Sequence, residues 1–453
     1  MPKLSALNID QKKTLRKASR NAVKDAFENL RPHFYRERWI SKSNRYSNNC
    51  IDSLEADTKS GCSVIHNDLA QYIAASAPLH CADGWSFLGR ALDCHAQGDK
   101  NAARHLGYYA ELRAAMSLLA VEGVGIFNRR HFAIQNSGNC QPCQPTGKNT
   151  YGTHEMAWLI LKHWADLKKS VELLAKIIQP GGIPLQDWLQ ELYSGSSLMS
   201  IGNKWLKTWG LDLQRFTEDR NARNEASYRP TQMNYVTPLD VLSSSNFIYN
   251  LWRINEPTNT PFEILDRYLL RLILEEGFKA RTGKSVKENP TDFEKLISLM
   301  LSRLEIRDTI ELWKDFLIRK TNSEDPVVIT EAQKKSKIDN PRHHLQVISR
   351  ATLLLRIATG ACSQLIKKAD FGRNDLKFWW KPFGEDRGLW KPKNEPDNLK
   401  DLWADIEMAV NEIQEWENNN KTNASYSHWQ RDCSLAISIL GSCERIALWG
   451  LDL

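Results

Sequence analysis

The stretch Tyr108-Tyr-Ala-Glu-Leu-Arg-Ala-Ala-Met-Ser-Leu-Leu-Ala120 is apolar around most of the circumference that a helix would present. A surface helix carries one apolar stripe, whereas a helix that is apolar on most sides belongs in the interior of a bundle. The stretch therefore predicts a central helix over residues 101–120, and other segments must supply the helices that surround it.

Apolar residues recur at three- and four-residue spacing through most of the chain, which indicates helices. Near the N-terminus the stripe includes Leu15, Ala22 and Leu30, with Asp10 as the expected N-cap. Two glycines and β-branched residues predict a short extended piece from Gly123 to Ile134. Further helices are expected over 66–77, 83–96, 153–178, 184–193, 212–227, 238–253, 261–282, 291–304, 306–319, 343–368, 398–418 and 426–449. Polar or Gly/Pro-rich loops are expected over 45–63, 135–152, 321–342 and 369–397. The expected fold is an all-α, multi-helix bundle.

With 453 residues the chain has the length of two or three domains. We expect a basic N-terminal helix and loop over 1–65, a helical bundle over 66–235 and a second helical region over 236–453.

Composition narrows the class of protein. Hydrophobic residues make up 42% of the chain and charged residues 25%, as in an ordinary globular protein. The N-terminus lacks the apolar stretch of a secretory signal, and no apolar run approaches the roughly 20 residues that a membrane-spanning helix needs. We therefore expect a cytoplasmic protein that does not enter a membrane.

The net charge of +7 is concentrated near the N-terminus. Residues 1–48 hold twelve Lys and Arg against four Asp and Glu. Such a basic helix is either a solvated helix face or an electrostatic footprint for nucleic acid or an acidic partner.

Several motifs of enzyme chemistry are missing from the sequence. It has no Gly-rich phosphate loop and no GxSxG elbow, and His154-Glu155 is followed by Trp158 where a zincin needs a second His. Cys140-Gln-Pro-Cys143 is the one close cysteine pair, while a structural zinc site usually needs two. Free thiols in a reducing compartment are expected, unless the fold brings in further ligands. No metal or cofactor is expected.

One segment combines groups that suit RNA chemistry. It contains Arg220, Arg223, Asn224 and Tyr228 on the expected helix over 212–227 and its end. An arginine can give a phosphate two hydrogen bonds from its planar fork. With a neighbouring proton-transfer group, such a site can cleave RNA without a metal ion, because the 2′-hydroxyl is the nucleophile.

This segment resembles the motif of the HEPN superfamily. Active ribonucleases of that superfamily carry an Arg, four to six residues and then a His, often with a polar residue directly after the Arg. The matching positions are Arg223 and Asn224, with Tyr228 in place of the His. The Tyr108–Ala120 helix and the turn Gly123 to His131 resemble the YaaC-like branch of the superfamily, so that the likeness covers about residues 66–235.

The resemblance implies that Arg223 holds phosphate, that Asn224 positions it and that Tyr228 donates a proton. Tyrosine has an ordinary pKa of about 10 and is a poor base at neutral pH. Tyr228 therefore acts as an acid beside another base, or the site binds RNA without cutting it. The alternative is structural: Arg220 and Arg223 form ion pairs with Glu111, Glu218, Asp219 or Glu225 and lock the bundle.

A second candidate surface is the stretch 377–392, in which Trp380-Lys-Pro and Trp390-Lys-Pro repeat ten residues apart. Aromatic and cationic residues together suit unpaired bases and phosphates, or a protein partner. Otherwise, buried tryptophans simply hold a long loop on its own domain. The candidate RNA- or partner-binding residues are Arg113, Arg220, Lys377, Trp379, Trp380, Lys381, Arg387 and Trp390.

Two functions follow as expectations. The first, implied by the resemblance, is a bacterial defence effector that cleaves or binds RNA without a metal ion and pairs with a second copy through its motif face. The second is a non-catalytic helical scaffold in an antiviral defence complex, with stretch 377–392 as its docking surface.

Overall fold

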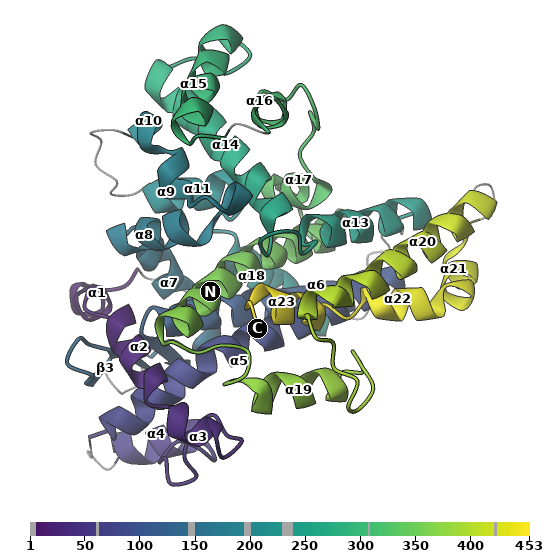
Figure 1. Ribbon diagram of the computed structural model, residues 1–453. Helices are drawn as coiled ribbons and strands as arrows, with labels where there is room; N and C mark the ends of the chain where they lie inside the picture. The colour runs from purple at the N-terminus through teal and green to yellow at the C-terminus, as the bar shows by residue number, and fades with distance from the viewer. Residues whose placement is uncertain are drawn as a thin grey trace.

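A computed structural model describes residues 6–59, 63–143, 150–193, 201–228, 239–306, 309–420 and 424–453. Helices make up 67% of the structure, which also holds one small three-stranded sheet. Figure 1 shows helices stacked around a central group. The all-α prediction is confirmed.

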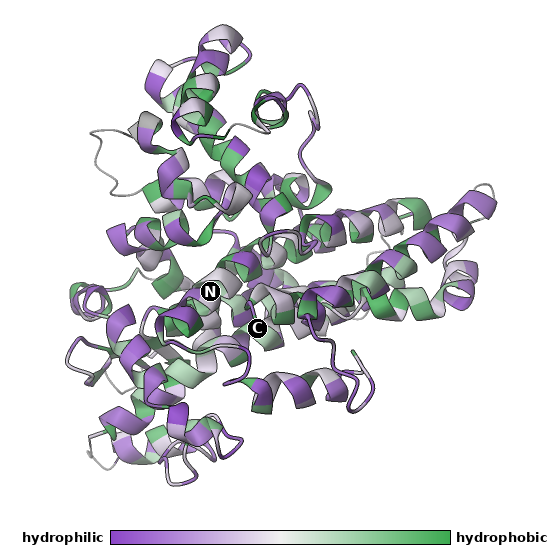
Figure 2. Ribbon diagram, in the orientation of Figure 1, coloured by the Kyte–Doolittle hydropathy of each residue, from purple (hydrophilic) through white to green (hydrophobic). Residues whose placement is uncertain are grey.

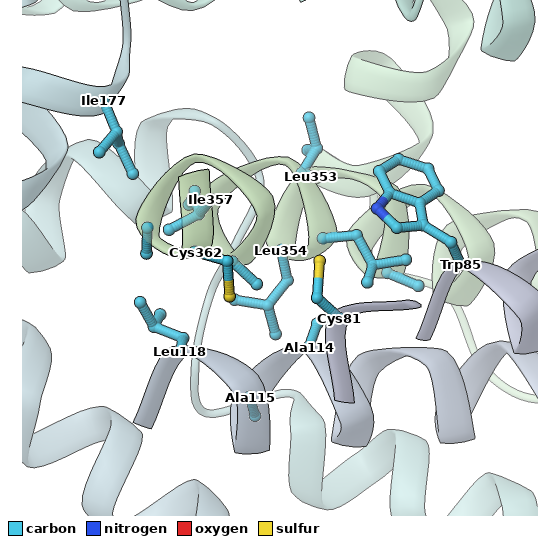
Figure 3. Packing of buried hydrophobic residues seen from close by; sticks show 14 of the residues in the cluster. Cys81, Trp85, Ala114, Ala115, Leu118, Ile177, Leu353, Leu354, Ile357 and Cys362 are labelled. Atoms are coloured by element: carbon cyan, nitrogen blue, oxygen red, sulfur yellow. The ribbon is translucent and has the colours of Figure 1, made fainter. Parts of the chain in front are cut away.

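Three long helices form the centre of the molecule. They are α5 (His66–Ala96), α6 (Lys100–Val121) and α18 (His343–Lys368). Figure 3 shows side chains of α5, α6 and α18 meeting, with Ile177 of α8 beside them. The stretch that predicted a central helix is α6, and its packing against α5 and α18 confirms that prediction.

Small residues on α6 allow α18 to come close. A side-chain carbon at Gly107 would already lie 3.3 Å from Val347. Ala114 and Ala115 are fully buried farther along the same helix. Short side chains let helix backbones approach one another, so that the long aliphatic residues of α18 fill the space between the axes.

Helix α5 differs from its prediction. Two helices were expected on either side of Pro78, but the chain continues as one helix through this buried proline. An interior proline removes a helix hydrogen bond and crowds the preceding turn. Burial of apolar residues on both sides, from Ile73 to Leu88, offsets that cost.

The N-terminal helices lie beside the central group, and α2 packs against α5 (Figure 1). They are α1 (Ile9–Arg16), α2 (Arg20–Glu28), α3 (Arg31–Phe34) and α4 (Cys50–Lys59). The N-cap of α1 is Asn8, which forms a capping box with Gln11, and not Asp10 as predicted. Helix α4 corrects the predicted loop 45–63, because Cys50 and Leu54 recur four residues apart and are both buried.

The predicted extended piece is confirmed as a hairpin, and a third strand extends it. Strands β1 (Val124–Phe127), β2 (Arg130–Ile134) and β3 (Cys140–Pro142) pair antiparallel in that order, with Val124 opposite Ala133. Strand β3 falls in the predicted loop 135–152. Gly123, at φ +87°, lets the chain turn from α6 into the sheet beside the backbone of Ser19.

Short helices build the middle of the chain around the centre. Their bounds are α7 (Thr153–Ala165), α8 (Lys168–Ile177), η1 (Pro180–Gly182), α9 (Leu185–Trp188), α10 (Gln190–Tyr193), α11 (Ile201–Thr208), α12 (Phe216–Tyr228), α13 (Val241–Ile254), α14 (Glu263–Thr282), α15 (Pro290–Arg303), α16 (Ile310–Leu317) and α17 (Val327–Gln333). Helix α17 corrects the predicted linker 321–342, since it buries Val328 and Ile329 and packs on α18.

The C-terminal part adds α19 (Lys377–Asp386), η2 (Leu399–Leu402), α20 (Trp403–Asn419), α21 (Tyr426–Asp432), α22 (Ser434–Leu440) and α23 (Glu444–Gly450). Helices α13, α20, α21 and α22 form an arm that projects from the centre (Figure 1). Trp252 holds its base by donating a hydrogen bond to the Leu440 carbonyl at 2.9 Å. Figure 2 shows hydrophobic residues where helices face one another and hydrophilic residues on their outer turns. Within the described residues, no helix is long and apolar enough to cross a bilayer.

Candidate functional site

Helix α12 is held on α6, α7 and α18 by its first turn. The ring of Phe216 stacks on that of Trp158 in α7, with centroids 4.3 Å apart and planes 6° from parallel. Asp219 accepts two hydrogen bonds from the Arg350 guanidinium of α18, at 2.6 and 3.0 Å. The remaining turns, which carry Arg220 to Tyr228, are placed by these two contacts.

Glu111 of α6 completes the buried charge group beneath α12. Its Oε1 lies 3.6 Å from Nε of Arg350, and Glu111, Asp219 and Arg350 are all buried. Burial, and then the charge of Asp219, raise the pKa of Glu111 well above its ordinary value. Burial therefore favours the protonated form of Glu111, and Asp219 forms the close ion pair with Arg350.

Arg223 has aromatic neighbours instead of acidic ones. Its guanidinium carbon lies 5.4 Å from the ring centre of Tyr108 and 5.5 Å from that of Tyr109. Its Nε is buried without a hydrogen-bond partner, and no carboxylate of the described chain lies within ion-pair distance. Cation–π contacts hold a guanidinium in place without neutralising it. Its charge remains available to an anion.

Arg220, one turn earlier, is neutralised. It donates a hydrogen bond to Glu155 of α7 at 3.0 Å. Glu155 was not among the carboxylates expected to pair with these arginines. Arg220 therefore forms an ion pair within the bundle, as the structural alternative predicted, but with Glu155 as its partner. Arg223 forms no such pair with the described residues.

His154, at the start of α7, lies against the same tyrosines. The Tyr108 hydroxyl accepts a hydrogen bond from Trp158 Nε1 at 3.3 Å and lies 3.0 Å from His154 Nδ1. If the hydroxyl gives its own proton to Nδ1, both groups are satisfied and Nε2 of His154 carries the imidazole proton. Burial, then the charges of Arg223 and Arg220, lower the pKa of His154 to about 4. His154 is a neutral hydrogen-bond donor at pH 7.

His105 of α6 has the opposite tautomer to His154, with the proton on Nδ1. The Ser227 hydroxyl gives its proton to the Arg223 carbonyl at 2.9 Å, so its contact of 2.8 Å with His105 Nδ1 requires that Nδ1 donate. Nε2 of His105 then carries a lone pair. Burial, and then Arg223, lower the pKa of His105. We call Arg223, His105, His154, Tyr108 and Tyr109 the arginine–histidine cluster.

The other predicted members of this site lie elsewhere. Tyr228 ends α12 with 80% of its surface exposed, and Asn224 is half-buried. Arg113 contacts α5, with its Nη1 2.7 Å from His80 Nδ1 and 3.6 Å from Asp83. Of the predicted residues, Arg223 is the one that lies in the cluster.

The sequence reasoning missed both histidines because they come from other helices. A signal was present in α6, where His105 precedes Tyr108 and Tyr109 by one turn and so shares their face. His154 had been considered only as a zinc ligand. The fold is what brings α7 to the same point.

The stretch 377–392 is not the predicted loop, because its first part forms α19. Trp380 is buried and donates a hydrogen bond to the Arg373 carbonyl at 2.9 Å, and Trp390 packs on it with ring centres 6.1 Å apart. This burial offsets the cost of Pro382 inside the helix. Both tryptophans of the repeated tripeptide thus hold the segment on its own structure.

Three cations of this stretch have internal partners. Lys377 and Lys381 approach Glu395 at 3.4 and 2.7 Å. Trp379 packs on Trp39, and Arg387 lies 3.9 Å from Glu444. A groove of about 770 Å³ runs between α3 and α19, and its lining includes Tyr35, which is 80% exposed, together with Lys377 and Lys381.

The cysteine pair lies at the end of the small sheet. Cys140 and Cys143 are buried as free thiols, and burial raises the pKa of Cys140 to about 12. Across the described residues, no three His, Cys, Asp or Glu side chains are grouped to hold a metal ion.

The chain matches no known protein-family model, no curated protein and no solved structure.

Proposed function

We propose that the arginine–histidine cluster binds an RNA phosphodiester and cleaves it without a metal ion, as an effector of a bacterial defence system. The observation that carries this proposal is the unpaired charge of Arg223 between two neutral histidines. An unpaired guanidinium on a partly exposed helix is a strong ligand for phosphate. The defence role rests on the resemblance of Arg223-Asn224 to the HEPN motif.

The hydrogen bonds of the cluster support a division of roles. Nε2 of His105, with its lone pair, removes the proton of the ribose 2′-hydroxyl. The 2′-oxygen then bonds to phosphorus while the bond to the 5′-oxygen breaks, and water supplies a proton to that leaving oxygen. Arg223 and Nε2–H of His154 donate to the phosphoryl oxygens as charge builds on them. The products are a 2′,3′-cyclic phosphate and a 5′-hydroxyl.

Cleavage of end-labelled RNA in EDTA tests this proposal. The wild type should cut, Arg223→Ala should lose about 10²–10³-fold in rate and His105→Asn about 10²–10⁴-fold. Tyr228→Phe is the matched control, because this exposed side chain lies outside the cluster, and its rate should stay within about twofold. Intact RNA in every lane, or equal cutting by all variants, would exclude the ribonuclease. Thermal melting of each variant separates loss of chemistry from loss of folding.

A second candidate function is that of a scaffold subunit, supported by the groove between α3 and α19. Tyr35 is an exposed aromatic beside this groove, and aromatic anchors dominate protein interfaces. Tyr35→Ala should then release a partner that co-purifies with the native protein, while Ile9→Ala, equally exposed but distant from the groove, should not. An unchanged set of co-purifying proteins would contradict this function.

A further inference from the structure

A basic cavity lies on another part of the molecule, where the C-terminal ends of α8 and α18 meet the turn before α14 and the end of the chain. Its volume is about 390 Å³, within the range of small-molecule sites. The cationic residues that line it are Lys176, Lys367, Lys368 and Arg356. Among the described lining residues, Asp452 is the one carboxylate.

The cationic charge of the cavity is only partly neutralised. Lys367 pairs with Asp452. Lys176 and Lys368 have no carboxylate of the described chain within ion-pair distance, and Lys368 contacts only the neutral Gln364, at 3.2 Å. Burial, and then the charge of Lys176, lower the pKa of Lys368, so the two ammonium groups repel one another across the site.

The nearby carboxylate of Glu122 is already paired with other cations. Glu122, which acts on Lys368 from a distance, binds Arg20 at 2.9 Å and Lys169 at 3.6 Å. Lys176 and Lys368 are exposed and line the cavity, so their charges are available to an anion that enters it.

Buried contacts of Arg356 join the elements that line the cavity. Arg356 is buried, and it binds Asp266 at 2.7 Å and the Ile177 carbonyl at 2.6 Å. Its guanidinium also lies 4.6 Å from the ring centre of Phe262. These contacts join α8, α14 and α18 at the cavity, so the lysines are carried on elements that are fixed relative to one another.

Neutral polar groups complete the lining. The hydroxyl of Thr260 is buried and has no hydrogen-bond partner among the described residues. Ser363, Gln364 and Gln179 also face the cavity. An unsatisfied buried hydroxyl is costly, and a ligand oxygen would satisfy it.

We propose that this cavity binds a compact soluble polyanion, namely a small molecule that carries two or more phosphate groups. Lys176 and Lys368 bind its phosphate groups, and the Thr260 hydroxyl donates a hydrogen bond to a phosphate oxygen. Lys367 leaves Asp452 and pairs with the ligand. The site stands independently of the arginine–histidine cluster, because the two share no lining residue.

Isothermal titration of the full-length protein with inorganic pyrophosphate tests the site. Saturable binding is expected, and Lys368→Gln and Lys176→Gln should each weaken it by at least about tenfold, as for the loss of one charge-assisted contact. Asp452→Asn should bind more tightly, because it frees Lys367. Lys295→Gln, an exposed lysine outside the cavity, is the matched control and should bind as the wild type does.

The outcomes are distinguishable from one another. No saturable binding, or equal weakening by Lys295→Gln, would overturn the proposal and leave the lysines as charges that stabilise two helix C-termini. Co-sedimentation with cardiolipin vesicles that Lys368→Gln abolishes, without pyrophosphate binding, would replace the soluble ligand by a lipid headgroup. Circular dichroism of each variant confirms that the helices are intact.

Discussion

Arg223 differs in its surroundings from three of the buried arginines of this chain. Arg271, Arg350 and Arg356 each bind an aspartate, at 2.6, 2.6 and 2.7 Å respectively. Arg223 instead rests on the faces of two tyrosines, and its charge is not matched by any described carboxylate. The sequence identified Arg223 because arginine suits phosphate, but it could not distinguish a paired arginine from an unpaired one. That distinction depends on which helices meet.

The lowered pKa of His105 predicts the pH dependence of RNA cleavage. A general base must be unprotonated, so kcat/KM should rise with pH up to this pKa and stay constant above it. Because the pKa lies below the ordinary value of about 6.5, the plateau should begin at acidic pH. The pH–rate profile of the wild type checks this. A rate that keeps rising above pH 7 would contradict the role of His105 as the base.

In the buried charge group beneath α12, two substitutions should differ in their effect on the free energy of unfolding. Arg350→Met leaves Asp219 charged and unpaired in the interior, and it should lower the free energy of unfolding by about 3–5 kcal/mol. Glu111→Gln keeps the shape of the side chain and its neutral form, which burial favours, and should be tolerated. Urea denaturation measures both. A large loss in Glu111→Gln at neutral pH would mean that Glu111 is ionised.

The raised pKa of Glu111 also fixes the sign of a pH effect. The folded protein holds this proton more tightly than the unfolded chain does, so the contribution of Glu111 to stability is full below the unfolded pKa of about 4.3 and is lost as pH rises toward the folded pKa. The stability of Glu111→Gln relative to the wild type should therefore increase with pH over this range. A constant difference would contradict the raised pKa.

At the scale of elements, the sequence was most informative where apolar spacing is regular. The central helix α6, the long α18 and the hairpin β1–β2 were predicted close to their observed bounds. Helix α19 was missed because Pro382 and Gly384 are typical of loops, and the burial of Trp380 that outweighs them is a tertiary effect. The short α4 and α17 were missed because two or three turns between polar flanking segments give little periodicity.

Where α5 crosses the turn between α22 and α23, one added methyl group should strongly lower the free energy of unfolding. A side chain at Gly89 would collide with the carbonyl oxygen of Gly441. Gly89→Ala should therefore lower the free energy of unfolding by about 1–3 kcal/mol. Gly152→Ala is the matched control, since no atom lies within 4 Å of its added carbon, and it should cost less than about 1 kcal/mol. Thermal melting of both proteins compares them, and equal melting temperatures would show that the crossing can relax.

At the scale of the whole molecule, one continuous core extends from Leu7 to Leu451. Helix α18, from the second half of the chain, packs against α5 and α6 from the first half. A chain ending at residue 238 should therefore expose the apolar faces of α5 and α6, lose cooperative unfolding and aggregate. Circular dichroism melting and size-exclusion chromatography measure this. A monomeric fragment with a sharp melting transition would show that the first half is an independent domain.

The position of α18 also affects the order in which the protein can fold during synthesis. Roughly 220 residues separate the end of α6 from the start of α18, and at about 5–20 residues per second a ribosome needs about 10–45 seconds to make them. Throughout that time the nascent chain displays the surface that α18 will cover. We expect ribosome-associated chaperones to cover this surface during synthesis. The partly folded chain should reach its native fold once the last quarter of the sequence has been made.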